Sequence, residues 1–222
     1  MFIPYRVNTL TCRSPWANLV LIGANLVIFA TVLSGGLSGE LLTRLVLFEW
    51  FAPVGFLGHQ FLHVYIGHLL GNMILLWVFG NSLSGVMHDL DFAVAYLTCG
   101  IVAGALHLVV DGSPVLGASG AISGVMGMYL AVYPRNEVSC FLWFFRPWNF
   151  DVKGYVLITA WFAWDLISAL RGVPGIACWA HVGGMLAGIG CGLVLLKMQR
   201  VYRGDYENPT MLELFAKEEE QS

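Results

Sequence analysis

The chain has 222 residues, of which 58% are hydrophobic and only 11% are charged, and its mean hydropathy is +0.73. A soluble globular domain carries about 25% charged residues, so this composition excludes a soluble fold and predicts an integral membrane protein. The formal net charge of -3 also argues against a nucleic-acid-binding surface.

Six apolar segments approach the length that is needed to cross a bilayer, which is about 20 residues for a helix. We therefore predict an all-α polytopic membrane protein, a bundle of six transmembrane helices. The predicted spans are Trp16–Leu33, His68–Val86, Phe92–Val110, Val115–Tyr133, Tyr155–Leu170 and Ile176–Leu196. The fourth and fifth spans are short, as helices shielded by others can be; re-entrant segments are the less favoured alternative.

The flanking segments divide the chain into three parts. Residues 1–15 are predicted to be a cytoplasmic N-terminal segment, residues 16–200 the membrane domain, and residues 201–222 a solvated cytoplasmic tail. The first apolar run lacks a small-residue cleavage pattern, so we interpret it as a retained anchor. Ser34–Leu57 is predicted to be a long outer loop, and Asn136–Phe150 an aromatic belt at the cytoplasmic interface.

Basic residues predict the orientation of the spans. Six spans place both termini on one side, and the positive-inside rule assigns that side to the cytoplasm. Only Arg44 and Arg171 then lie outside. The basic residues inside are Arg6, Arg13, Arg135, Arg146, Lys153, Lys197, Arg200, Arg203 and Lys217.

This orientation brings four polar side chains to one depth near the outer face. Ser119 lies near the outer end of the fourth span and His181 near the outer end of the sixth, while His68 and Asn72 lie one turn apart in the outer half of the second. Polar residues within a span are costly and are more often functional. Their common depth therefore predicts a site.

A serine and a histidine at one depth indicate nucleophilic catalysis. A serine hydroxyl becomes a good nucleophile when a base accepts its proton, and neutral histidine is the usual base near neutral pH. We predict that His181 activates Ser119, whose place at a helix N-terminus also offers free N–H groups to an oxyanion. Ser123, one turn deeper on the same face, is the rival nucleophile but lacks these N–H groups.

Small residues predict how the fourth and sixth spans meet. Glycines share one face of each span, and glycine lets two helix backbones approach closely. The two sets are Gly120, Gly124 and Gly127 in the fourth span, and Gly184 and Gly188 in the sixth. Contact between them would bring Ser119 within hydrogen-bonding reach of His181.

Other polar residues have weaker interpretations. Asp165 lies near the outer end of the fifth span, but nothing in the sequence places it beside His181, so we interpret it as a satisfied or water-facing carboxylate. His59 and His63 lie four residues apart, as metal ligands on a helix do, yet no Cys or carboxylate completes a site nearby. The prediction is therefore no metal and no cofactor, with His59 and His63 as polar scaffolding.

Three motifs resemble those of rhomboid intramembrane serine proteases, and the resemblance covers about Trp16 to Arg200. The motifs are His59…His63…His68-Leu-Leu-Gly-Asn72-Met73, Gly117-Ala-Ser119-Gly120-Ala-Ile-Ser-Gly124 and Ala180-His181-Val-Gly-Gly184…Gly188. The resemblance implies a six-helix bundle with a water-filled cavity that opens outward. It implies a Ser119–His181 dyad without a required acidic member, and an oxyanion hole formed by Asn72, His68 and the Ser119 N–H.

The resemblance also implies a function, which is hydrolysis of peptide bonds in single-span membrane proteins near the outer face. Partners would be transmembrane substrates and membrane lipid, and the fifth span would be the substrate gate, with Trp161, Phe162 and Trp164 packing there. The compact form favours a bacterial cytoplasmic membrane. The main alternative is a non-catalytic rhomboid-like protein that binds membrane clients, and a third is a small transporter or metal carrier.

Two positions depart from the family pattern. Many members carry a Trp-Arg pair in the first outer loop, whereas Phe48-Glu49-Trp50-Phe51 has no arginine after Trp50. Members often have an aromatic residue one turn after the nucleophile, packed on the catalytic histidine, and Ser123 occupies that position here. His181 must then be oriented in another way, or Ser123 joins a hydrogen-bond network.

Overall fold

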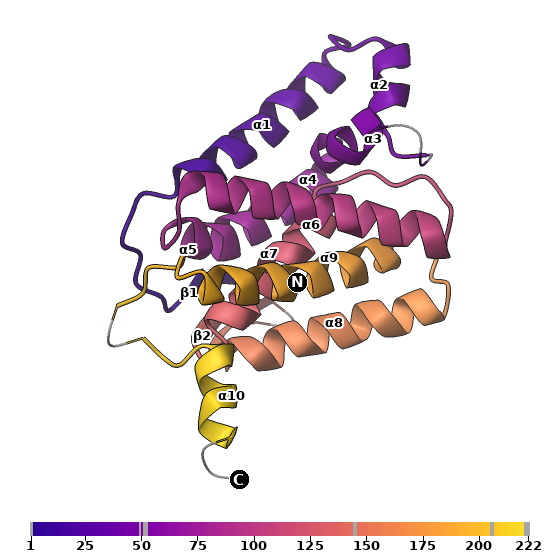
Figure 1. The fold of residues 1–222 in the computed structure, drawn as a ribbon. Coiled ribbons are helices and arrows are strands. Elements are labelled where there is room, and N and C mark those ends of the chain that lie inside the picture. Colours follow the sequence, from indigo (N-terminus) through magenta and orange to yellow (C-terminus); the bar gives the residue numbers. More distant parts are fainter. Residues whose placement is uncertain (1, 49, 51–52, 144–145, 205–206, 220–222) are drawn as a thin grey trace.

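The computed structural model describes residues 2–48, 50, 53–143, 146–204 and 207–219. Most of this part is a bundle of helices (Figure 1). The longer helices are α1 (Trp16–Leu33), α4 (Ile66–Leu75), α6 (Asp89–Val110), α7 (Ser119–Val132), α8 (Gly154–Leu170) and α9 (Cys178–Lys197). The shorter ones are α2 (Gly39–Leu45), α3 (Pro53–Gly58), the 3₁₀ turn η1 (His59–Phe61), the π-helical turn η2 (Leu76–Gly80), α5 (Asn81–Ser84) and α10 (Met211–Glu219).

The predicted helical membrane bundle is confirmed, since each predicted span coincides with a helical segment. Within the described residues, α1, the continuous run Ile66–Ser84, α6 and α9 are long and apolar enough to cross a membrane. The segments α7 and α8 have 14 and 17 residues and are shorter, as expected for the fourth and fifth spans. Nearly every residue of α7 is buried, because the other helices surround it.

The predicted glycine contact between the fourth and sixth spans is also confirmed. A Cβ added to Gly184 would overlap the Gly120 carbonyl oxygen, and one added to Gly188 would overlap the Gly124 carbonyl oxygen. The backbones of α7 and α9 therefore touch directly. Any side chain larger than a hydrogen atom at these glycines would separate the two helices.

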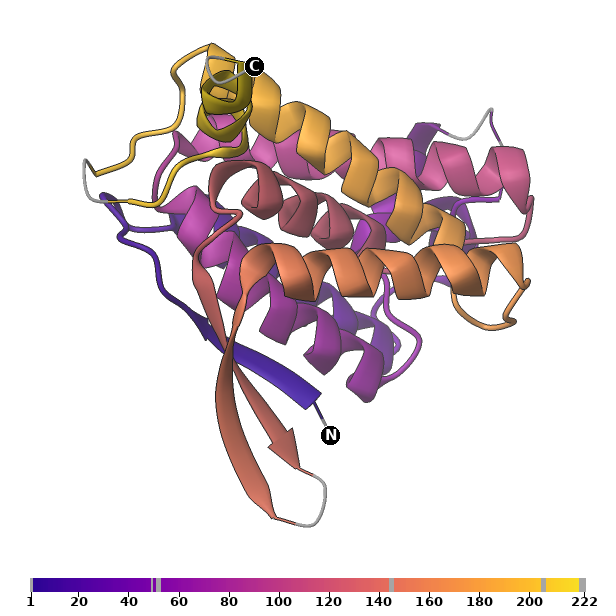
Figure 2. The same cartoon turned by 90° about the horizontal axis from the view of Figure 1, so that it is seen from below.

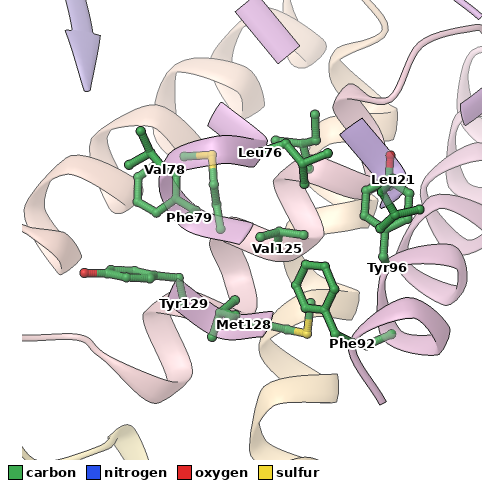
Figure 3. Close-up of a cluster of buried hydrophobic side chains, with 14 of the residues drawn as sticks. Leu21, Leu76, Val78, Phe79, Phe92, Tyr96, Val125, Met128 and Tyr129 are labelled. Atoms are coloured by element: carbon green, nitrogen blue, oxygen red, sulfur yellow. The ribbon is translucent and has the colours of Figure 1, made fainter. Parts of the chain in front are cut away.

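A cluster of large side chains fixes α7 against the second and third spans (Figure 3). The rings of Phe79 on η2 and Tyr129 on α7 meet edge to face, with centroids 5.1 Å apart. Phe92 and Tyr96 of α6 and Met128 of α7 are fully buried in the same cluster. Close van der Waals packing of such side chains holds the central helix in place.

A three-stranded antiparallel sheet accompanies the bundle, and the sequence did not predict it. The strand β1 (Phe2–Val7) pairs with β2 (Glu137–Trp143), which pairs with β3 (Pro147–Lys153). Figure 2 shows β1 in indigo beside the β2–β3 hairpin, which projects away from the helices. The description "all-α" therefore applies to the membrane bundle and not to the predicted N-terminal segment or aromatic belt.

Contacts between connecting segments show that successive spans alternate in direction. At one end Leu47 and Val115 pair through backbone hydrogen bonds of 3.0 and 3.2 Å. At the other end the Tyr202 N–H donates to the Val86 carbonyl over 2.6 Å. The segments that flank α1 and α9 on their terminal sides thus lie at the end opposite to Ser119.

The C-terminal segment carries a capped helix, which the sequence did not predict. A reciprocal capping box opens α10: the Thr210 N–H donates to Glu213 Oε2 (2.6 Å), and the Glu213 N–H donates to Thr210 Oγ1 (3.2 Å). Asn136 Nδ2 donates to the Asn8 carbonyl and to Glu207 Oε2, over 2.7 and 2.9 Å. These bonds join both terminal segments to the turn that follows α7.

We expect Gly184→Ala to destabilise the protein, because its methyl group would overlap the Gly120 carbonyl oxygen and force α7 and α9 apart. Overpacking of this kind costs typically about 1–3 kcal/mol. Gly190→Ala on the same helix is the control, since nothing lies within 4 Å of its added Cβ. Thermal unfolding in detergent micelles compares the two variants, and equal melting temperatures would contradict the role of this contact.

Candidate active site

A cavity of about 930 Å³ brings the four predicted site residues together. Ser119 of α7, His181 of α9, and His68 and Asn72 of α4 all line it. Residues of β1, α6 and α8 and of the connections before α4, α7 and α9 complete its wall. Side chains from three predicted spans therefore reach one shared cavity, as their common depth in the sequence indicated.

Ser119 is the first residue of α7 and is half-buried at the cavity wall. No side chain caps this helix, and the Ile122 N–H, which donates to the Ala118 carbonyl over 2.9 Å, makes an early helical hydrogen bond. The N–H groups before Ile122 lie in the first turn, where a helix has no internal acceptors for them. Together with the helix dipole they can bind negative charge.

Gly117 lets the His68 ring approach the serine. Its φ is +125°, a backbone conformation that residues other than glycine rarely adopt. A Cβ at Gly117 would lie 2.8 Å from His68 Cε1 and 3.7 Å from Ser119 Oγ. The imidazole of His68 therefore lies against the backbone immediately before Ser119, and a larger residue at position 117 would displace it.

His63 orients the Asn72 side chain, a pairing that the sequence did not reveal. Asn72 Nδ2 lies 3.0 Å from His63 Nε2, and both side chains are buried. Burial and the neighbouring His68 lower the pKa of His63 to about 4, so the ring is neutral near pH 7. A neutral Nε2 accepts one Asn72 amide hydrogen and leaves the other for the cavity. The His63 ring also meets His68 edge to face at 5.0 Å.

His181 lies beside Asp165, which corrects the interpretation of that carboxylate as merely satisfied or water-facing. His181 Nδ1 is 3.3 Å from Asp165 Oδ1, and the two side chains are only 15% and 8% exposed. Sequence spacing could not reveal this contact because it depends on how α8 is rotated against α9. The available signal was a carboxylate within an otherwise apolar span, since such residues need a partner.

The contact between the two catalytic candidates is indirect in this structure. Within the described residues no hydrogen bond joins Ser119 to His181. Their neighbours are adjacent, however, since a Cβ on Gly120 would lie 3.6 Å from the Ala180 carbonyl oxygen. Catalytic hydrogen bonds are often long before substrate binds. Ser123 also lines the cavity, one turn deeper.

A family model for the Rhomboid domain matches residues 47–198, which is more than half of the chain. The chain belongs to the rhomboid family. This membership accounts for the helical membrane bundle and agrees with the three sequence motifs.

Relatives of this rhomboid include mitochondrial and bacterial proteins. "Rhomboid protein 1, mitochondrial" of Saccharomyces cerevisiae is 30% identical over 62% of this chain and 40% of its own. "Presenilin-associated rhomboid-like protein, mitochondrial" of Homo sapiens is 29% identical over 58% of this chain and 34% of its own length. "Rhomboid protease GluP" of Bacillus subtilis is 29% identical over 57% of this chain and 23% of its own length. The chain spans less than half the length of each, and this mixture does not support the predicted bacterial membrane.

The remaining residues that the family resemblance singled out have different surroundings. Trp161 lines the cavity, Phe162 is partly buried against the core, and Trp164 is 70% exposed. The segment at the Trp-Arg position lies partly outside the described residues, which omit Glu49 and Phe51. In the described part of this rhomboid, no group of three or more His, Cys, Asp or Glu side chains could hold a metal ion.

We expect His63 to make this rhomboid less stable as the pH falls from 6.5 to about 4. In the unfolded chain a histidine binds a proton below about 6.5, whereas folded His63 resists protonation until about 4. Between pH 4 and 6.5 the unfolded state binds more protons than the folded state, so the contribution of His63 to stability rises with pH over this range. Above pH 6.5 this contribution is constant.

His63→Gln tests this dependence, because glutamine can accept a hydrogen bond but does not titrate. Between pH 6.5 and 4 the melting temperature of His63→Gln should fall less than that of the unmodified protein. Parallel curves for the two proteins would show that His63 does not contribute.

Proposed function

We propose that this rhomboid is an intramembrane serine endopeptidase that hydrolyses peptide bonds of single-span membrane proteins near the outer membrane face. The supporting observation is the cavity that Ser119 and His181 share, at the uncapped N-terminus of α7 and beside the glycine contact with α9. The relative named a rhomboid protease supports the reaction class. The concentration of basic residues at the end with both termini supports an outward-facing site.

In the first step Ser119 Oγ attacks the carbonyl carbon of the scissile peptide bond, and His181 accepts the hydroxyl proton. The tetrahedral oxyanion receives hydrogen bonds from the Ser119 N–H and from the side chains of Asn72 and His68. A single donor of this kind lowers a barrier by about 2.7–4 kcal/mol. His181 then protonates the leaving amine, and the C-terminal part of the substrate departs with a new amino terminus.

In the second step a water molecule attacks the acyl-enzyme while His181 accepts its proton. Collapse of the new tetrahedral intermediate returns the proton to Ser119 and releases the N-terminal part of the substrate with a new carboxyl terminus. The lining residues on α4 and α8, Trp161 among them, support entry of the substrate segment between these helices.

The substrate must expose a peptide bond to be cut. A helix in lipid satisfies its backbone groups internally and hides them, so cleavage favours segments with helix-destabilising residues near the outer face. The proposal requires neither a metal nor a cofactor, since Ser119 and His181 supply the nucleophile and the base.

Ser119→Ala should abolish cleavage of a reconstituted single-span substrate, because it removes the attacking oxygen. Ser123→Ala is the matched control, one turn away on the same helix, and should retain most activity. Product masses from a panel of substrates would locate the cut. Full activity in Ser119→Ala with loss in Ser123→Ala would reassign the nucleophile.

A serine-reactive fluorophosphonate probe separates the protease from a non-catalytic client binder. The unmodified protein should be labelled at Ser119, and Ser119→Ala should not. Client binding without labelling or cleavage would favour the binder.

Asn72→Ala should lower kcat about a hundredfold to a thousandfold and leave KM nearly unchanged, because an oxyanion donor acts on the transition state. Initial-rate kinetics over a range of substrate densities in liposomes measure both quantities. A change in KM alone would show that Asn72 binds substrate in its ground state instead.

A further inference from the structure

Asp165 lies on the buried face of α8, where an ionisable side chain is unexpected. Ile158, two turns before Asp165, and Ser168, one turn after it, are buried, and Trp161 lines the cavity. The Asp165 side chain is itself only 8% exposed. A carboxylate within a membrane-spanning helix is expensive and is kept where it has a partner or a role.

The partner of this carboxylate is His181. Among the ion pairs of the described residues, Asp165 takes part in one, with His181 Nδ1 at 3.3 Å from its Oδ1. The contact joins α8 to α9 beside the cavity, since His181 lines it and Asp165 itself does not. Asp165 therefore touches the base from the side away from the reacting atoms.

The Nδ1 atom of His181 has a second property that points to Asp165. It is buried, and within the described residues it has no hydrogen-bond partner. The 3.3 Å approach has the distance of an ion pair without the alignment of a hydrogen bond. A small rotation of the imidazole ring would align Nδ1–H with the carboxylate, and catalytic hydrogen bonds commonly tighten in this way when substrate binds.

Ser123, one turn after Ser119, explains why the His181 ring needs a contact that orients it. Ser123 presents a hydroxyl there, so no ring from that position can pack on His181. In the part of the chain that the structure describes, no aromatic ring contact involves His181. The polar side chain that lies against its ring nitrogen is Asp165.

We propose that Asp165 is a positioning residue that holds His181 with Nδ1 protonated and Nε2 facing Ser119. The inference rests on the proposed Ser119–His181 chemistry and extends it from two residues to three. The Ser119 hydroxyl proton moves to His181 Nε2 and then to the leaving amine, while Asp165 stays ionised and stabilises the transient imidazolium. Which nitrogen of a histidine carries the proton depends on the hydrogen bond that the other makes.

The test uses Asp165→Asn in the full-length protein, reconstituted with a single-span substrate. An asparagine amide can hold His181 in the wrong tautomer, so kcat should fall about a hundredfold or more, while KM changes less than about threefold. Asp165→Glu keeps the carboxylate and should recover part of kcat. Ser168→Ala, on the same buried face but not in the cavity wall, is the control and should keep full activity.

Several outcomes would overturn the inference. The first is a kcat of Asp165→Asn close to that of the unmodified protein. The second is a change in the KM of Asp165→Asn without a change in its kcat. The third is a loss of kcat in Ser168→Ala equal to that in Asp165→Asn. Ser119→Ala in the same assay separates the two proposals. If it is inactive while Asp165→Asn is fully active, only the role of Asp165 fails; if it still cleaves, the Ser119 mechanism itself fails.

A measurement on the unmodified protein decides the matter if Asp165→Asn does not fold. The ¹⁵N NMR signals of the histidine side chains, assigned to position 181 by comparison with His181→Gln, report which ring nitrogen is protonated. We expect protonation at Nδ1 in the neutral ring. Protonation at Nε2 would overturn the inference.

Discussion

The direct backbone contact between α7 and α9 is the constraint on which the rest of the structure depends. Gly184 and Gly188 leave no space for a side chain against the carbonyl groups of Gly120 and Gly124. Because Ser119 precedes Gly120 and His181 lies one turn before Gly184–Met185, the same contact brings their helix ends together. Water does not drive helix association inside a bilayer, so close packing of small residues must do so. In this chain that packing also assembles the candidate nucleophile and base.

The site is a small polar region in an apolar bundle, and two of its polar side chains, Asn72 and His181, have a polar neighbour outside the reacting atoms. His63 contacts the amide of Asn72, and the carboxylate of Asp165 contacts the imidazole of His181. A buried polar group without a partner costs about 1–3 kcal/mol, so the hydrogen bond between His63 and Asn72 stabilises the fold. Both contacts restrict the rotation of the residues that face the cavity.

Local patterns predicted most of the bundle and the candidate site. The spans follow from apolar length, and the shared end of Ser119, His181, His68 and Asn72 follows from counting spans. The pairing of β1 with β2 escaped prediction because the two strands lie more than 100 residues apart in the chain, whereas the β2–β3 hairpin is local but its aromatic residues were interpreted as an interfacial belt. The capped C-terminal helix escaped because its charged residues are also typical of a solvated tail.

By itself, then, the sequence determined the family, the number and order of the apolar spans, the glycine faces and the depth of the polar residues, because these depend on length, charge and helical spacing. The tertiary structure alone decided that Asp165 meets His181 and that His63 meets Asn72. The first contact joins different helices, and the second joins a helix to the loop before it. Each depends on the rotation of one segment relative to another, which no spacing within a single helix encodes.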